Sequence, residues 1–302
     1  MTPAASRPRH TAPQQDVLRG ILLMLGTSLV FPVMNAFGKH LNGEYSPVET
    51  IWARNLGHFI LVVALFWPRF GPRLFLTRHL PAQLMRSVMM VCSTTLFFIA
   101  ITTVPLADAA AIGFTGPLMV TALSVPLLAE KVGWRRWTAV VVGFVGALIV
   151  IRPGGGSGAA QLGAILILAS VACYALYQIL TRRLAAYDPA ETTVTYSVLV
   201  GTIVFSAIVP FYWQTPRSLT HVGMFCAIGL LGAAGHFLLA KAFMYGPAAV
   251  ISPFHYAQLI GATAFGYFMF GNFPDLWTWV GAAVIVASGL FIAYRETVVK
   301  RQ

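Results

Sequence analysis

The chain contains two copies of one pattern, and the number of apolar segments in each copy fixes how the copies lie. Ser46-Pro47-Val48-Glu49-Thr50 returns as Asp188-Pro189-Ala190-Glu191-Thr192. Other matched positions keep a spacing close to 140 residues: Asn35 with Gln178, Lys39 with Arg182, Ala100 with Ala240, and Trp137-Thr138 with Trp277-Thr278. Each copy holds five apolar segments. Because five is odd, the second copy enters a bilayer from the opposite side, and inverted repeats of this kind build a site at their mid-membrane interface.

The composition is that of a membrane protein. Apolar residues make up 58% of the chain and charged residues 10%, whereas a soluble domain carries about 25% charged residues. Ten segments are long enough to cross about 30 Å of hydrocarbon. The sequence therefore predicts an all-α integral membrane protein, with ten transmembrane helices forming two inverted five-helix repeats. The predicted spans are 17–41, 47–67, 82–104, 107–129, 134–151, 161–183, 189–213, 220–244, 247–270 and 276–294.

Around the spans, the polar segments define the domain organisation. A Pro-rich, polar tail over residues 1–16 is predicted to be disordered. The first repeat occupies 17–153, a Gly-rich linker 154–160, the second repeat 161–295, and a short tail 296–302.

The basic residues predict the orientation in the membrane. With ten spans, both termini and most Lys and Arg residues fall on one side, while the other side receives only Lys39, Arg152 and Arg217. The positive-inside rule then places both termini in the cytoplasm, in a bacterial-type inner membrane. The net charge of +11 does not indicate a nucleic-acid partner, because the basic residues lie in short interhelical segments rather than on one face.

One stretch of the first repeat carries a family resemblance. It begins with Pro105-Leu106-Ala107-Asp108-Ala109-Ala110 and continues to Pro117. It then contains Leu128-Ala129-Glu130-Lys131, followed by Trp134, Trp137, Gly143 and Gly146-Ala147. With the two five-helix halves, this resembles EamA-type members of the drug/metabolite transporter superfamily. The resemblance implies a ten-helix secondary transporter of small metabolites, often amino acids. The second half has Phe270-Gly271 where a Glu equivalent to Glu130 is common, so the resemblance implies no shared role for paired glutamates here.

Polar side chains deep inside spans are the candidate substrate-binding residues, because burying them against lipid is costly. Asn35 on the first span matches Gln178 on the sixth, which has Tyr174 and Tyr177 beside it. Amides at matched positions of inverted helices converge near the pseudo-twofold axis. We therefore predict that Asn35 and Gln178 contact substrate, the alternative being a hydrogen bond between helices.

The second and eighth spans carry basic candidates. Arg54 and His58 lie one helical turn apart and share a face. Arg54 either holds a substrate carboxylate or extends toward the membrane surface. His236 and Lys241 are five residues apart and share a face only loosely. Lys241 either contacts substrate or reaches the cytoplasmic surface.

The ninth span contains a predicted break. Pro253 interrupts the helix just before His255, Tyr256 and Gln258. A broken helix frees backbone groups for a ligand. We predict that His255 lines the substrate cavity, with Gln258 on the same face.

Energy coupling has few candidates in this sequence. No Asp or Glu lies in the middle of a span, so coupling through an intramembrane carboxylate has no evident carrier. Protons remain a candidate co-substrate through His58, His236 or His255, the alternative being passive exchange. The chain lacks a phosphate-binding loop and any metal-ligand spacing of Cys and His, so neither direct ATP drive nor a metal or other cofactor is predicted.

These features favour a transporter that works by alternating access. The predicted partners are the lipid bilayer and a small zwitterionic metabolite, with amino acid export favoured. A nucleoside-like metabolite, riboflavin or S-adenosylmethionine is the alternative cargo.

Two alternative functions come from other classes of protein. An intramembrane lipid-modifying enzyme needs a convergent acid/base or metal set, which the sequence does not offer. A membrane scaffold needs apolar internal faces, which Asn35, Gln178 and His255 contradict. The sequence does not predict an oligomeric state.

Overall fold

The computed structural model describes residues 16–129, 132–154, 157–184, 187–245 and 248–299, without the side chains of 248–249 and 296–299, so Glu130 lies outside it. The described residues form helices and turns, with no strand among them. The first repeat contains α1 (Val17–Asn42), α2 (Pro47–Phe70), the 3-10 turn η1 (Gly71–Phe75), α3 (Leu80–Ala100), α4 (Leu106–Gly113), α5 (Gly116–Leu128) and α6 (Trp134–Ile151). The second contains α7 (Gly158–Leu184), α8 (Ala190–Ile208), η2 (Val209–Phe211), α9 (Leu219–Met244), α10 (Ala248–Ile251), η3 (Ser252–Ala257), α11 (Gln258–Phe270) and α12 (Leu276–Val299).

Nine described segments are long and apolar enough to cross a membrane, and they match nine of the ten predicted spans. The remaining predicted span, the ninth (247–270), is the interrupted series α10, η3 and α11. The fold is therefore the predicted all-helical membrane fold of two five-helix repeats.

Two spans are broken, one in each repeat. The predicted break near Pro253 is present, since the six residues of η3 separate α10 from α11. The fourth span, predicted over 107–129 with no break singled out, is interrupted as well. It stops at Gly113 and restarts at Gly116, because Pro117 lies in the first turn of α5 and has no backbone N–H to continue the ladder.

The freed carbonyl groups of the ninth span already have a partner. The Ser28 hydroxyl on α1 lies 3.1 Å from the carbonyl oxygen of Phe254 and 3.3 Å from that of His255. The same hydroxyl lies 3.0 Å from the carbonyl oxygen of Met24, and with one hydrogen it donates to one of the three oxygens at a time. The carbonyl groups at the break are therefore only partly satisfied by Ser28.

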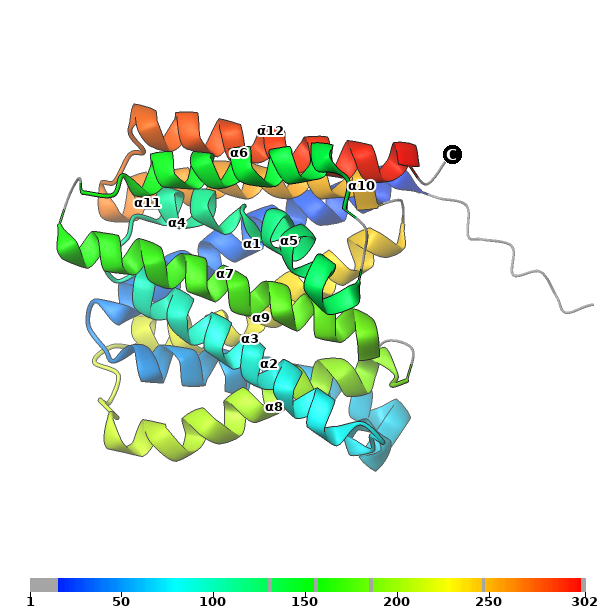
Figure 1. Ribbon diagram of the computed structural model, residues 1–302. Helices are drawn as coiled ribbons and strands as arrows, with labels where there is room; N and C mark the ends of the chain where they lie inside the picture. The colour runs from blue at the N-terminus through cyan, green and yellow to red at the C-terminus, as the bar shows by residue number, and fades with distance from the viewer. Residues whose placement is uncertain (1–15, 130–131, 155–156, 185–186, 246–247, 300–302) are drawn as a thin grey trace, which may run out of the picture.

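Helix packing follows the symmetry of the repeats. Helix α1 packs against α9 as α3 packs against α7, while α2 packs against α8 and α6 against α12 (Figure 1). Glycines allow the closest approaches: a Cβ atom added at Gly229 of α9 would lie 2.6 Å from the Cα atom of Gly57 of α2. Each repeat therefore buries its helices against the other repeat rather than folding as a separate bundle.

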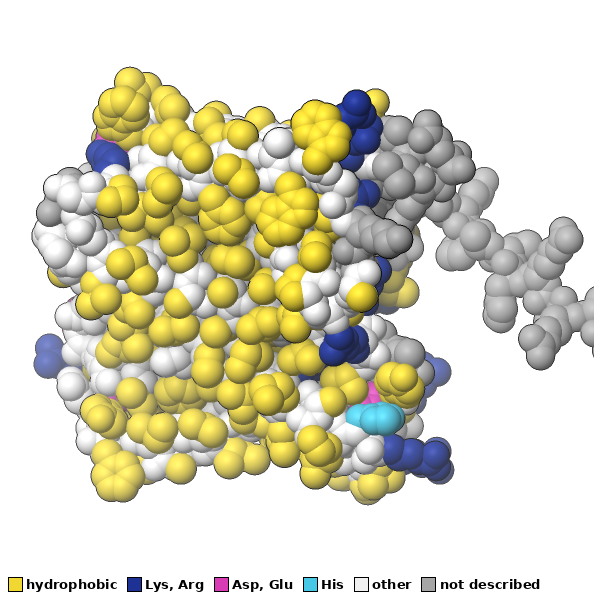
Figure 2. Space-filling model, in the orientation of Figure 1, with side chains coloured by type: hydrophobic (Ala, Val, Ile, Leu, Met, Phe, Trp, Pro, Cys, Tyr) yellow, Lys and Arg dark blue, Asp and Glu magenta, His cyan; other side chains and the backbone are white. Residues whose placement is uncertain are grey.

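The two ends of the bundle differ in charge. Figure 1 shows that α1 begins and α12 ends at the same end, which we call the terminal end; the other is the distal end. In Figure 2, apolar side chains cover the surface between the ends, and most of the visible Lys and Arg side chains gather at the terminal end. This distribution is typical of a membrane protein with a bias in its basic residues.

Candidate functional site

A cavity of about 500 Å³ lies between the two repeats. Helices α1, α4, α5 and α7 contribute to its wall, as do α9, η3, α11 and α12. The wall contains six of the residues proposed from the sequence: Asn35, Tyr174, Gln178, His255, Tyr256 and Gln258. The matched amides Asn35 and Gln178 thus share one cavity, although they come from opposite repeats.

Aromatic rings form much of the wall. The Phe114 ring lies edge-on to Tyr256, with ring centroids 4.9 Å apart, and to His255, at 6.5 Å. Gly289 of α12 makes room for Tyr256, because a Cβ atom there would lie 2.1 Å from the tyrosine hydroxyl. Phe97 lines the cavity as well. Sequence periodicity did not single out Phe97 or Phe114, since a phenylalanine facing lipid and one facing a cavity give the same pattern.

None of the described residues that line the cavity is an Asp, Glu, Lys or Arg. Its polar groups are the amides of Asn35, Gln178 and Gln258, the rings of His255 and two tyrosines, and two hydroxyls. The wall therefore offers hydrogen-bond donors and acceptors together with ring faces, but no formal charge from these acidic and basic side chains.

Arg54, His58 and His236 form a separate buried cluster between α2 and α9. The two imidazole rings stack with centroids 5.6 Å apart. The guanidinium Nη1 of Arg54 donates to the Thr94 hydroxyl at 3.4 Å, and its Nε has no hydrogen-bond partner among the described residues. Tyr174 interacts electrostatically with Arg54 and also lines the cavity. The cluster is thus next to the cavity wall without forming part of it.

The two remaining candidates lie away from the wall as well. Tyr177 stacks on Tyr174, with centroids 5.6 Å apart, and its ring also contacts the buried guanidinium of Arg86, 4.7 Å from the ring centroid. Its hydroxyl lies 3.5 Å from that of Ser197. Lys241 lies over the ring of Phe237 at 5.7 Å. The sequence reasoning overlooked Arg86, which is fully buried and hydrogen-bonded to α7 and α8, because it treated this arginine as a surface charge.

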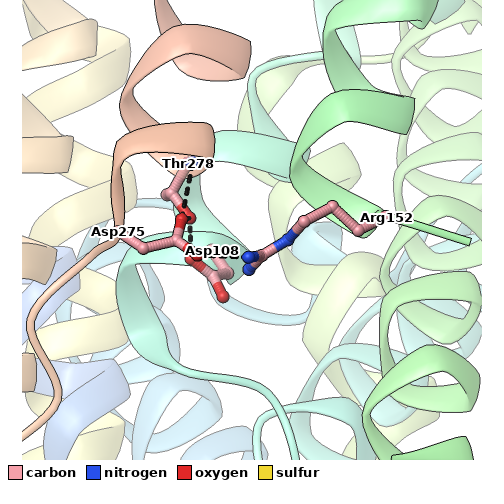
Figure 3. A network of polar contacts seen from close by, with 4 residues as sticks. All are labelled: Asp108, Arg152, Asp275 and Thr278. Atoms are coloured by element: carbon pink, nitrogen blue, oxygen red, sulfur yellow. Dashed lines mark hydrogen bonds and ion pairs between the residues drawn. The ribbon is translucent and has the colours of Figure 1, made fainter. Parts of the chain in front are cut away.

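A polar network joins the repeats at the distal end (Figure 3). The Thr278 hydroxyl lies 2.8 Å from a carboxylate oxygen of Asp108 and 3.0 Å from one of Asp275. Arg152, which follows α6, donates to Asp275. Partial burial of Asp275 opposes ionisation, but hydrogen bonds from Thr278 and Arg152 outweigh it and lower the pKa of this carboxyl. The network links α4 and the end of α6 to the start of α12.

Lys39 closes the same end from α1. Its ammonium group donates to the carbonyl oxygens of Ile101 (2.5 Å) and Val104 (2.7 Å), in the turn before α4. The cavity wall extends instead toward the terminal end, where Phe243 and Ala293 lie near the ends of α9 and α12. Polar contacts between the repeats also occur at the terminal end, where Thr77 and Gln83 donate to a carboxylate oxygen of Asp188 at 2.7 Å and 2.8 Å.

An all-helical membrane protein with two inverted repeats and a cavity between them has the architecture of a secondary transporter. The profile of the EamA-like transporter family matches residues 18–152 and again residues 161–294, so the chain belongs to this family. Its resemblance to drug/metabolite transporters is thereby confirmed.

Relatives with named cargoes match nearly the whole chain. The riboflavin transporter of Vibrio cholerae is 29% identical over 283 residues, covering 93% of this chain and 94% of the relative. An S-adenosylmethionine uptake transporter of Rickettsia prowazekii is 28% identical, covering 91% of each chain. The pseudopaline exporter of Pseudomonas aeruginosa is 26% identical, covering 90% of this chain and 95% of the relative.

A solved crystal structure of a protein 15% identical to this one superposes with a TM-score of 0.65, covering 91% of this chain and 96% of the other. At this identity the match supports the fold alone. Together these findings make the chain a membrane transporter of small metabolites.

Proposed function

We propose that the protein carries a planar, nitrogen-containing aromatic metabolite across the membrane by alternating access, and that Asn35, Gln178 and the rings around His255 bind it. The observation that carries this proposal is the chemistry of the wall. A flat heterocycle presents two apolar faces and a polar edge. Aromatic rings in the wall can stack on the faces of the heterocycle. Neutral amide groups can pair with the donors and acceptors on its edge.

The size of the cavity supports the same class of substrate. A volume of about 500 Å³ falls within the range of about 300–1,000 Å³ that is usual for ligand sites. The names of two relatives agree with this class, since riboflavin contains a fused heterocycle and S-adenosylmethionine contains adenine. Riboflavin-like and nucleoside-like compounds are therefore the first substrates to test.

Amino acid export, which the sequence alone favoured, is the second candidate. It rests on Arg54, a buried cation for which the described residues provide only one long hydrogen bond. A substrate carboxylate would pair with this charge if Tyr174 moved aside. The uncharged wall ranks this candidate second, because a buried carboxylate without a cationic partner is costly. The relatives include both uptake transporters and an exporter, so the direction is part of the test.

Transport in proteoliposomes tests the proposal. Purified protein would be reconstituted, and counterflow of labelled riboflavin, adenosine, S-adenosylmethionine and an amino acid mixture would be measured in parallel. Saturable counterflow of a heterocyclic compound supports the proposal. Counterflow of amino acids alone, lost in Arg54→Ala, would replace it with the second candidate.

Variants connect the activity to the cavity. Asn35→Ala and Gln178→Ala each remove an amide from the wall and should raise KM for the transported compound about tenfold, as expected for one lost hydrogen bond of about 1.4 kcal/mol. Asn272→Ala removes an exposed amide outside the cavity and serves as the matched control. Unchanged KM in both cavity variants would contradict the proposed site.

A further inference from the structure

Two histidines and a glutamate meet at the distal end of the bundle, away from the cavity. His40 lies in the last turn of α1, Glu44 in the turn that follows, and His221 in the first turn of α9. One ligand atom from each residue lies within 4.8 Å of the others. Both histidines are half-buried and the glutamate is exposed. The residues that form this cluster are therefore contributed by both repeats.

The surrounding contacts hold the histidine of the second repeat in place. The Ser218 hydroxyl accepts a hydrogen bond from the His221 backbone N–H at 3.2 Å. The hydroxyl of buried Tyr45 lies 2.7 Å from Nδ1 of the same histidine and accepts the N–H of Arg217 at 2.8 Å. A second polar contact on the ring is what usually orients a metal-binding histidine. The ring of His221 is therefore positioned before any ligand arrives.

Among the described residues, the glutamate has only long contacts with charged or titratable groups. Its carboxylate lies 3.8 Å from Nδ1 of His221 and 4.0 Å from Nη1 of Arg217, whose side chain is 68% exposed. An exposed arginine at that distance contributes little and can move into solvent.

We propose that His40, Glu44 and His221 bind a divalent transition-metal ion of the zinc type, at a site separate from the substrate cavity. Two imidazoles and one carboxylate form a ligand set that zinc uses when a fourth position stays open to water. Magnesium and calcium prefer all-oxygen sites, so the imidazoles select against them. Donor atoms within 4.8 Å need to move inward by only about 1–2 Å to bind one ion at bond lengths of about 2.1 Å.

The proposed ion would link the end of α1 to the start of α9. It would bind the folded protein and not the unfolded chain, and a ligand of that kind stabilises the fold. Because the cluster shares no residue with the cavity wall, its test does not depend on the substrate.

Zinc binding to the purified protein tests the proposal. The full chain, prepared without a histidine tag and stripped with a chelator, would be titrated with Zn²⁺ against a fluorescent zinc indicator. Its melting temperature would be recorded with and without the ion. We expect one tight site per chain, a melting temperature that rises with Zn²⁺ and falls back with chelator, and no competition from excess Mg²⁺.

Three variants and one control assign the site. His40→Gln, His221→Gln and Glu44→Gln should each weaken binding at least tenfold, whereas His79→Gln changes a half-buried histidine outside the cluster and should leave it unchanged. Glu44 is exposed, so its variant keeps the test valid if a histidine variant fails to fold. Undiminished binding in the cluster variants, or the absence of saturable binding in the unaltered chain, would overturn the proposal.

Discussion

Asp108 and Thr278 join the two repeats through a hydrogen bond of 2.8 Å that has no counterpart in the sequence at the other end of the bundle. The repeat spacing that aligns Glu130 with Gly271 aligns Asp108 with Ala249, and the spacing of the Trp-Thr pairs aligns Thr278 with Thr138. The repeats are therefore alike in backbone but unequal in the polar groups at their ends. The terminal end is joined by a different set of hydrogen bonds, from Thr77 and Gln83 to Asp188, so each end of the bundle has its own polar contact between the repeats.

Removing the carboxylate or the hydroxyl should shift the protein toward opening at the distal end. We expect Asp108→Asn and Thr278→Val each to shift the equilibrium by about 1–2 kcal/mol, which is roughly a five- to thirtyfold change in population. Labelling of a cysteine placed in the cavity at Thr121, with a membrane-impermeant reagent added from either side, measures the shift. Thr138→Val, at the matching position of the first repeat, should leave the labelling unchanged. Equal labelling in all variants would argue against a closing role.

The ion pair at the distal end predicts a dependence on pH. The pKa of Asp275 is lowered in the folded protein. The stability that its ionised form provides is thus fully present above the unfolded pKa, about 3.9, and is lost as pH falls through the lower folded pKa. Asp275→Asn should therefore lower the melting temperature at pH 7, by an amount that shrinks as the pH falls below about 3.9. A difference that persists unchanged down to pH 3 would show that ionisation of Asp275 is not its source.

The contact between Gly57 and Gly229 predicts a strong effect of a single methyl group. A Cβ atom at Gly229 would lie 2.6 Å from the Cα atom of Gly57, so Gly229→Ala should push α2 and α9 apart and cost about 1–3 kcal/mol. Gly223→Ala on the same helix meets nothing within 4 Å and should be neutral or slightly stabilising. Melting temperatures of the two purified variants make the comparison. Equal melting temperatures would mean that the helices adjust freely.

Energy coupling is testable at three histidines. His255 lines the cavity, whereas His58 and His236 lie in the buried cluster beside it. We expect counterflow to proceed without a pH gradient or sodium, as in a passive exchanger. We also expect that none of the variants His58→Gln, His236→Gln and His255→Gln changes the pH dependence of transport. Uphill accumulation of substrate under an imposed pH gradient would contradict this expectation. The histidine whose replacement abolishes that accumulation would then be the proton carrier.

The orientation is testable by chemical labelling. The basic residues predict that both termini are cytoplasmic. Single cysteines at positions 2 and 302 should react with an impermeant reagent only after the membrane is opened. Labelling of either position in intact cells would reverse the orientation or change the number of spans.

The sequence repeat and the odd number of spans in each copy predict most of the fold. Both features can be recognised from the lengths of the apolar segments and the spacing of matched residues alone. Matched amides predict a shared location for Asn35 and Gln178, since symmetry relates their positions. The break after Gly113 was not predicted, because Pro117 lies inside the predicted span 107–129 and was considered only as part of the family resemblance. The meeting of His40 with His221 could not be predicted either. It depends on how α1 packs against α9, and no local pattern encodes that contact.

The burial of Arg54 has a consequence for how the protein is made. The span that contains it has the lowest mean hydropathy of the nine candidate spans. An arginine opposes insertion of a lone helix by about 3 kcal/mol at the helix centre and by less toward its ends, and Arg54 lies about two turns from the start of α2. Thr94 and Phe98, which contact the guanidinium, lie on α3, while the histidine that stacks on His58 lies on α9. During synthesis, the surroundings of Arg54 and His58 are therefore incomplete until α9 has been made, and we expect stable insertion of α2 to depend on the helices that follow it.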